Sequence, residues 1–196
     1  MNYSERSFST LVVSSSSKFN DFLKPILAER HCEPVTTVEN VSAAKRALNE
    51  REYDFLIINS PLTDDPGIKL SIDSSEGRST VSLLLVRSEW YDELFAKVSE
   101  HGVFILPKPT SVSAVSEALS FLSSAFMRLR QISKKTNSLE EKMKEIRLVN
   151  HAKWVLIEQQ KMTEEEAHKY IERHAMDNGL TKTDVANEIL KVSSIQ

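Results

Sequence analysis

The sequence is poor in glycine, proline and cysteine. It has four glycines, six prolines and one cysteine in 196 residues, which excludes collagen-like and low-complexity chains. The single thiol, Cys32, has no internal partner, so we expect no disulfides and no oxidising compartment. The N-terminus lacks the order of a signal peptide, and the longest apolar runs, such as residues 82–86, are far shorter than the ~18 residues of a membrane span. A cytoplasmic protein without a membrane partner is therefore expected.

The chain as a whole has no large excess of positive or negative charge: 25 basic and 28 acidic residues leave a net charge of −3. The distribution is nevertheless uneven. Residues 128–161 carry nine basic and four acidic side chains, a net +5, between an N-terminal part at −5 and a C-terminal part at −3. Such a cationic segment is either a surface for a polyanion or the solvated face of a long exposed helix.

Helix-breaking residues are absent from most of the second half. All six prolines and three of the four glycines precede residue 110. From Thr110 to Asn178 no glycine or proline occurs, and apolar residues recur at helical spacing, which predicts long continuous helix. We therefore expect an α/β domain over residues 1–120, a coiled-coil helix over 121–146 and a small all-α three-helix module over 147–196.

The first 110 residues alternate between short apolar runs and amphipathic stretches. The runs predict strands at Ser9–Ser14, Glu33–Thr37, Asp54–Asn59, Val81–Val86 and Val103–Leu106, and the stretches predict helices at Lys18–Arg30, Val41–Glu50 and Tyr91–Glu100. The polar stretch Thr63–Thr80, with Gly67 and Gly77, is predicted to be a mobile crossover in place of a helix. Continuous apolar strands between helices indicate an α/β flavodoxin-like doubly wound parallel sheet, whose crevice lies at the carboxyl ends of the strands.

Polar residues follow four of the predicted strands. They are Ser14 and Ser15 after the first strand, Asn59 after the third, Ser88 after the fourth and Lys108-Pro109 after the fifth. This arrangement resembles the receiver domain of bacterial response regulators. In that family the first strand ends in an acidic pair that holds Mg²⁺, the third in the aspartate that takes the phosphoryl group, the fourth in a Ser or Thr, and the fifth in Lys-Pro. Here serines replace the acidic pair and Asn59 replaces the phosphoacceptor.

These replacements remove the chemistry of phosphorylation. Mg²⁺ requires anionic oxygen ligands, and an asparagine amide is not a carboxylate nucleophile. We therefore interpret Asn59, Ser14, Ser15, Ser88 and Lys108 as a degenerate phosphoacceptor site, with no metal and no cofactor. Lys108 is expected to pair locally or to face solvent rather than to bind a small anion. Control would then come from a protein or small-ligand partner at the receiver-like domain.

Catalytic patterns are missing elsewhere. None of the five histidines belongs to a zinc-protease pattern, one thiol cannot build a structural zinc site, and no glycine-rich phosphate loop occurs. We do not expect an enzyme.

A seven-residue repeat begins at Leu122. One seam consists of Leu122, Leu129, Thr136, Met143 and Asn150, and the other of Ala125, Ile132, Leu139 and Ile146. Four heptads with charged flanks such as Lys135 and Glu140 favour a parallel coiled coil and a homodimer. The expected dimer seam is Leu122, Leu129, Ile132, Leu139, Met143 and Ile146. The alternative is a long helix that packs on the sheet of its own domain.

Two further helices follow this repeat. Thr163-Glu164-Glu165-Glu166 is a capping box, so a helix begins near Glu164 and ends at Asn178-Gly179. Another helix begins at Thr181. Their apolar positions and those of the preceding helix are few and small: Val149, Ala152, Leu156, Ala167, Ile171, Ala175, Val185 and Ile189. A module with so small a core is marginal alone.

Four linked segments of this module carry a second resemblance. They are Arg147-x-Val-Asn-His-Ala152-Lys153-x-x-Leu156, Met162-Thr163-Glu164-Glu165-Glu166-Ala167, Arg173-His-Ala175 and Asp184-Val185-Ala186-x-x-Ile189. Together they resemble the ANTAR module, a three-helix RNA-binding unit of bacterial transcription antiterminators. The order of receiver-like domain, coiled coil and module is similar to the nitrate- and amide-responsive members of that family. Trp154 stands where the family usually has glycine, and Asn150 and His151 replace more usual charged residues.

The resemblance implies an RNA-binding transcription antiterminator whose dimer takes paired RNA hairpins of a leader transcript by their loops. Lys153 and Arg173 match family positions expected to face RNA, and the neighbours expected to join them are Lys161, Lys182, His168 and Asn178. Such side chains pair with phosphates and base edges, and aromatic rings stack on unpaired bases. Tyr170 is expected to be a core residue rather than a stacking surface.

Two other functions stay open. A DNA-binding transcription factor would need a recognition helix rich in Arg, Gln or Asn, and residues 181–191 are poor in these. A dimeric signalling or scaffold protein would use the helical tail to bind a partner protein.

Overall fold

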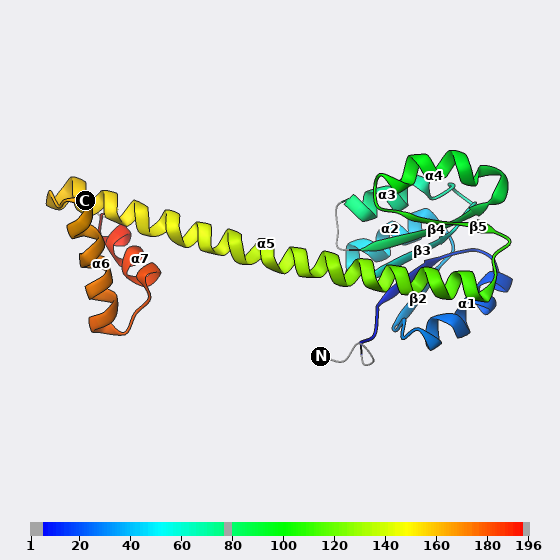
Figure 1. Ribbon diagram of the computed structural model, residues 1–196. Helices are drawn as coiled ribbons and strands as arrows, with labels where there is room; N and C mark the ends of the chain where they lie inside the picture. The colour runs from blue at the N-terminus through cyan, green and yellow to red at the C-terminus, as the bar shows by residue number, and fades with distance from the viewer. Residues whose placement is uncertain (1–5, 77–79, 194–196) are drawn as a thin grey trace. The chain divides into compact units, whose positions relative to one another are not determined.

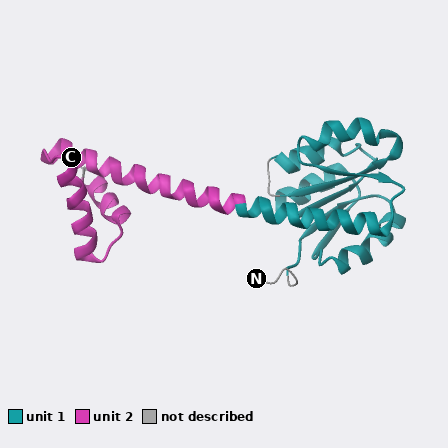
Figure 2. Ribbon diagram, viewed as in Figure 1, with its two compact units in different colours: residues 1–131 teal, residues 132–196 magenta. Residues whose placement is uncertain are grey.

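The computed structural model describes residues 6–76 and 80–193. The chain divides into two compact units, residues 1–131 (unit 1) and 132–196 (unit 2) (Figure 2). Helix α5, Val112–Gln160, passes from one unit into the other. No helix within the described ranges is both long and apolar enough to cross a membrane.

Unit 1 contains a five-stranded parallel sheet in the order β2-β1-β3-β4-β5 (Figure 1). The strands are β1 Thr10–Val13, β2 Val35–Val38, β3 Phe55–Asn59, β4 Val81–Arg87 and β5 Phe104–Lys108. All four pairings are parallel, and Asn59 of β3 lies opposite Leu85 of β4. The predicted flavodoxin-like fold is confirmed, and the carboxyl ends of β1, β3 and β5 lie at one edge.

Helices cover both faces of the sheet (Figure 1). They are α1 Ser17–Glu29, α2 Val41–Glu50, α3 Ile68–Glu76, the short 3-10 helix η2 Ser88–Trp90, α4 Tyr91–Ser99 and the first part of α5. Helices α1 and α5 share one apolar cluster with the sheet, and α2, α3 and α4 share the other. Each central strand is therefore buried on both faces, which explains its unbroken apolar run.

Helix α3 corrects the prediction of a crossover without a helix. Ile68–Glu76 is helical, and Leu70 packs in the core. Two serines are buried beside it, and Ser71 Oγ donates a hydrogen bond of 2.6 Å to the carbonyl of Ile68. Because serines occupy the buried face, the helix has little apolar periodicity in the sequence. Gly77, part of the same prediction, lies outside the described residues.

The first part of α5 packs on the sheet of unit 1. Its buried side chains are Val115, Ala118, Leu119, Leu122 and Phe126. Leu122 is 0% exposed, so its place in the dimer seam was wrong: a side chain enclosed by its own domain has no surface for a partner. The alternative of a helix packed on its own sheet is correct as far as Phe126.

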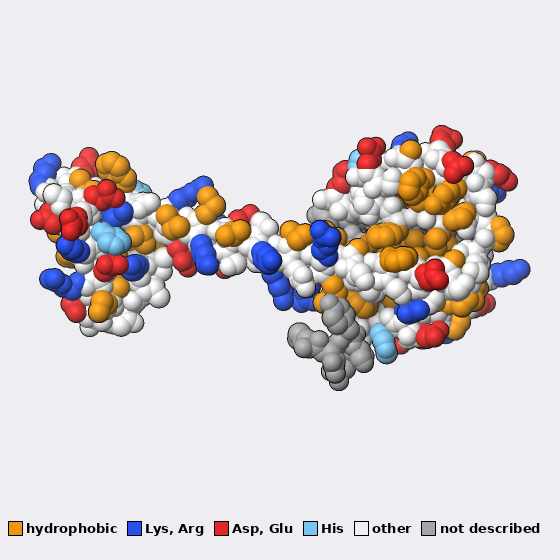
Figure 3. Space-filling model, viewed as in Figure 1, with side chains coloured by type: hydrophobic (Ala, Val, Ile, Leu, Met, Phe, Trp, Pro, Cys, Tyr) orange, Lys and Arg blue, Asp and Glu red, His pale blue; other side chains and the backbone are white. Residues whose placement is uncertain are grey.

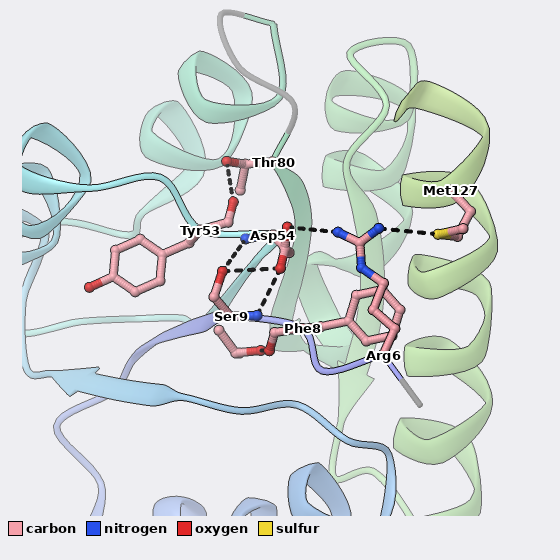
Figure 4. A network of polar contacts seen from close by, with 8 residues as sticks. Arg6, Phe8, Ser9, Tyr53, Asp54, Thr80 and Met127 are labelled. Carbon is pink, nitrogen blue, oxygen red and sulfur yellow. Dashed lines mark hydrogen bonds and ion pairs between the residues drawn. The ribbon is translucent and has the colours of Figure 1, made fainter. Parts of the chain in front are cut away.

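A polar network holds this part of α5 near the start of β3 (Figure 4). The guanidinium of Arg6 lies 3.7 Å from a carboxylate oxygen of Asp54, 3.6 Å from the sulfur of Met127 and 4.9 Å from the ring centroid of Phe126. Asp54 also accepts a hydrogen bond of 2.8 Å from the backbone N–H of Ser9. The segment before β1, strand β3 and helix α5 are thereby joined within unit 1.

Unit 2 contains the remainder of α5 with α6 Glu164–Asn178 and α7 Lys182–Ser193. Thr163 and Glu166 form the predicted capping box, and Gly179 ends α6 in the left-handed conformation at φ 63°. The buried core is Ala152, Leu156, Ala167, Ile171, Ala175, Val185 and Ala186. The three-helix module is present, and four of its seven core residues are alanines.

Candidate functional site

The receiver-like crevice is closed by hydrogen bonds among its own residues. Asn59 is buried, and its amide donates 3.0 Å to the hydroxyl of Ser14. The ammonium of Lys108 donates 2.6 Å to the amide oxygen of Asn59 and also bonds the carbonyl of Ser60. The hydroxyl of Ser88 donates 2.8 Å to the carbonyl of Lys108. Ser14, Asn59 and Lys108 therefore meet, Ser88 joins them through the backbone, and Ser15 is exposed.

The partners of Lys108 are neutral. Burial lowers the pKa of its ammonium, and the positive charge of Arg87 lowers it further. Among the described residues, no three His, Cys, Asp or Glu side chains gather as a metal site. An amide, a hydroxyl and an ammonium that bond one another do not fit Mg²⁺, which needs anionic oxygens. Lys108 pairs locally, as its lack of carboxylate neighbours indicated.

The rest of the predicted dimer seam is exposed along α5. The exposed fractions are Leu129 45%, Ile132 51%, Leu139 62%, Met143 53% and Ile146 60%. These large apolar side chains recur at the a and d positions of successive heptads. Phe121 is also 62% exposed. The heptad pattern did not identify it as an exposed apolar residue, because it lies one position before the repeat.

Three predicted RNA-binding side chains of unit 2 are bound to carboxylates. Lys153 Nζ lies 3.1 Å from Glu164. Lys182 Nζ lies 2.5 Å from Glu172, and a ring nitrogen of His168 lies 3.3 Å from the same carboxylate. The hydrogen bond and charge of Lys182, with the charge of His168, lower the pKa of Glu172. The Lys153–Glu164 pair joins α5 to α6 and the Lys182–Glu172 pair joins α7 to α6, whereas His168 and Glu172 both lie on α6.

The other three predicted side chains differ from these. Asn178 is exposed, and its amide donates 2.9 Å to the carbonyl of His174 at the end of α6. Arg173 and Lys161 are exposed, and neither belongs to an ion pair in the described parts of the chain. Positive and negative side chains are mixed over the visible face of unit 2 (Figure 3). Whether a basic side chain of unit 2 is available to a ligand therefore depends on its own carboxylate partner rather than on the net charge of the unit.

Two aromatic side chains of unit 2 are exposed. Tyr170 is 38% exposed and stacks on His174 at 5.6 Å between ring centroids, with 11° between planes. Its assignment to the core was wrong, because Ile171 and Ala167 take the buried face of α6. Trp154 is 69% exposed on α5. The i, i+4 spacing of Tyr170 and His174 was the sequence signal for their contact.

Comparison with known proteins agrees with both units. Residues 137–190 match the ANTAR domain. The transcriptional regulatory protein PdtaR of Mycobacterium tuberculosis, from strains CDC 1551 and H37Rv, is 26% identical over 169 residues, which cover 86% of this chain and 82% of that protein.

Solved structures resemble unit 1. The signal receiver domain of an HD domain-containing protein from Pseudomonas fluorescens Pf-5 has a TM-score of 0.57 and 22% identity, covering 67% of this chain and 97% of that one. A structure described as adenylate cyclase from Rhodopirellula baltica has a TM-score of 0.58 and 18% identity, covering 69% and 98%. At these identities the likeness shows the fold alone.

The fold of unit 1 and the module of unit 2 together define a response-regulator-like architecture. Unit 1 has the fold of a receiver domain, residues 137–190 of unit 2 match the ANTAR domain, and the chain is similar to PdtaR over most of its length.

Proposed function

We propose that the protein is a dimeric, RNA-binding transcription antiterminator whose ANTAR modules bind paired hairpins of a leader transcript. The observation that carries the proposal is the ANTAR match over residues 137–190, which includes all of α6 and most of α7. PdtaR, similar over most of the chain, is named a transcriptional regulatory protein. RNA loops are recognised by charged, hydrogen-bonding and aromatic side chains, and α6 exposes all three kinds.

The proposed dimer uses α5 over residues 129–146. Exposed apolar side chains at heptad spacing on a helix are stabilised when a second helix covers them. The proposed contact begins later than residue 121, because Leu122 and Phe126 are buried in unit 1. The functional boundaries we propose are therefore a receiver-like domain that includes the start of α5, a dimerisation segment over 129–146, and the module beyond it.

The receiver-like domain is proposed to act without aspartyl phosphorylation. Ser14, Asn59 and Lys108 are joined by hydrogen bonds, and none of the three is a carboxylate. The group therefore offers neither a nucleophile for the phosphoryl group nor anionic ligands for Mg²⁺. A protein or small-ligand partner of this domain would then supply the signal.

The test is a binding measurement with the full chain and RNAs that carry one or two hairpins. Two hairpins should bind much more tightly than one, because the second contact is intramolecular in a dimer. Ile132→Asp with Leu139→Asp should give monomers by light scattering and should remove the advantage of the second hairpin. Glu141→Ala, on the opposite side of α5, is the matched control and should change neither.

Two results would contradict the proposal. Equal competition by duplex DNA would favour a DNA-binding transcription factor. Failure of the parent protein to bind either RNA would favour a signalling or scaffold role. A dimer that survives both aspartate substitutions would place the interface elsewhere, while leaving RNA binding to be judged on its own measurement.

A further inference from the structure

The two flanks of α6 differ in how their charges are compensated. On one flank, Glu172 binds both His168 and Lys182, and Lys169 lies 2.6 Å from Glu165. Every cation of this flank therefore has a carboxylate partner. Moving such a cation to a phosphate would require breaking an existing ion pair, and the pair of Lys182 with Glu172 joins α7 to α6.

The other flank carries Tyr170, Arg173, His174 and Asp177. Their spacing of i, i+3, i+4 and i+7 places them on one face of the helix. The rings of Tyr170 and His174 lie nearly parallel at 5.6 Å. Arg173 is exposed and has no ion pair among the described residues, not even with Asp177 one turn away. The face combines two stacked aromatic rings, whose outer faces can take a further ring, with a guanidinium that has no ion pair among the described residues.

We propose that Tyr170 and His174 form a stacking surface for one unpaired nucleobase of the RNA loop, beside which Arg173 binds the adjoining phosphate or base edge. This inference rests on the proposed RNA-binding function and assigns the contact to one flank of α6. The His168–Glu172–Lys182 group is correspondingly a structural ion-pair group that does not contact RNA.

The chemistry of the face favours a nucleobase over a bare phosphate. Nucleobases stack on aromatic rings and on guanidinium planes. A carboxylate beside the rings repels phosphate, but Asp177 can accept a hydrogen bond from a base N–H, and Arg173 can donate one. A tyrosine needed only for the core would be enclosed, whereas Tyr170 is 38% exposed although Ala167 and Ile171 beside it are buried.

The experiment measures affinity for a two-hairpin RNA and for copies in which each loop nucleotide in turn is abasic. Tyr170→Leu should weaken binding to the intact RNA about 10-fold, the effect of losing one stacked base. Tyr170→Phe keeps the ring and should bind as the parent does. His174→Ala should also weaken binding, while His168→Ala, the same change on the opposite flank, should alter it less than about 2-fold.

The abasic RNAs identify the stacked base. For one loop position, Tyr170→Leu and the abasic substitution should each reduce affinity, and together they should reduce it no more than either alone, because both remove one contact. At the other positions the losses should multiply. Circular dichroism melting confirms that each variant is folded; if Tyr170→Leu is not, His174→Ala carries the same test with the same abasic RNAs.

Three outcomes overturn the inference in distinguishable ways. If the parent binds the RNA and Tyr170→Leu and His174→Ala bind it equally well, the surface is not a base site, although the proposed function stands. If Tyr170→Leu converts the dimer to monomers in sedimentation, the face is an interface between copies. If the parent does not bind RNA at all, the proposed function itself fails.

Discussion

Units 1 and 2 are stabilised by different means. Of the twelve largest fully buried side chains in the described chain, eleven lie in unit 1 and only Leu156 lies in unit 2. The core of unit 2 is mostly alanine, and the unit adds a capping box, a left-handed glycine cap and ion pairs between its helices. Some of the charged side chains of unit 2 therefore stabilise its fold through ion pairs between helices. A basic residue there indicates a ligand site only if it has no carboxylate partner within the unit.

The two units also differ in whether the polar side chains of their candidate sites already have partners within the protein. At the sheet edge of unit 1, the side chains of Ser14, Asn59 and Lys108 bond one another. On α6 of unit 2, Arg173 and Tyr170 are exposed, and His174, whose ring stacks on Tyr170, is half-buried. A site whose groups are mutually paired opposes a new ligand, whereas unpaired groups on a fixed helix are ready to bind. The difference supports the proposal that unit 2, rather than the crevice of unit 1, binds RNA.

The largest expected effect comes from the same deletion in each core. Leu122→Ala and Leu156→Ala remove the same atoms from fully buried positions and should each cost about 2–5 kcal/mol. Unit 1 should stay folded at 25 °C with a lower melting temperature, because many other large side chains fill its core. Unit 2 should lose its structure, since among its described residues Ile171 is the only other leucine-sized side chain that is as fully enclosed, and most of the rest of its core is alanine.

Hydrogen exchange followed by mass spectrometry distinguishes the units. In Leu156→Ala, peptides from α6 and α7 should exchange rapidly while peptides from β3 and β4 keep their protection. Glu141→Ala, an exposed residue on the same long helix outside the proposed dimer seam, is the control and should change neither set. Protection of α7 in Leu156→Ala equal to that in the parent would contradict the difference between the two cores.

A smaller effect is expected from acid. Hydrogen bonding and charge from Lys182 lower the pKa of Glu172 below its ordinary value of 4.5. A carboxyl group whose pKa is lowered by folding stabilises the fold above that ordinary value, and this contribution is lost as pH falls through the folded-state pKa. Unit 2 should therefore keep its stability from pH 7 to about pH 5 and lose part of it at lower pH.

Thermal melts of the parent and of Glu172→Gln over a series of pH values from 7 downward measure this contribution. The substitution should lower the melting temperature of unit 2 at pH 7, and by progressively less as the pH falls below the ordinary pKa of 4.5. Glu188→Gln, an exposed carboxylate on α7 outside the described ion pairs, should have no such pH-dependent effect. If Glu172→Gln and Glu188→Gln changed the melting temperature equally at every pH, the ion pairs of Glu172 would not contribute to the stability of unit 2.

In the crevice of unit 1 we expect phosphodonors to have no effect. Incubation with acetyl phosphate and Mg²⁺ should leave the intact mass of the parent unchanged. Asn59→Asp should also remain unmodified, because Ser14 and Ser15 still provide no acidic pair for Mg²⁺. A stoichiometric gain of about 80 Da, one phosphoryl group, in the parent would show that the crevice is not degenerate.

Local patterns in the sequence were sufficient for the strands and for the α-helices other than α3, in their order. Apolar runs marked the five strands, the capping box marked the start of α6, and Gly179 marked its end. Helix α3 escaped because buried serines gave it no apolar period. The crevice residues could also be located, since the ends of parallel strands meet at one edge.

The tertiary structure alone decided which side chains are free. A heptad pattern places Leu122 and Leu129 in one seam, but only the packing of α5 on the sheet shows that the first is buried and the second exposed. Likewise, Lys153 and Arg173 look alike in the sequence. The carboxylate that binds Lys153 is eleven residues away and reaches it only because α6 packs on α5. Charge pairing and burial depend on contacts between elements, which no local sequence pattern records. These contacts leave Tyr170 exposed, and they leave Arg173 exposed without an ion pair among the described residues.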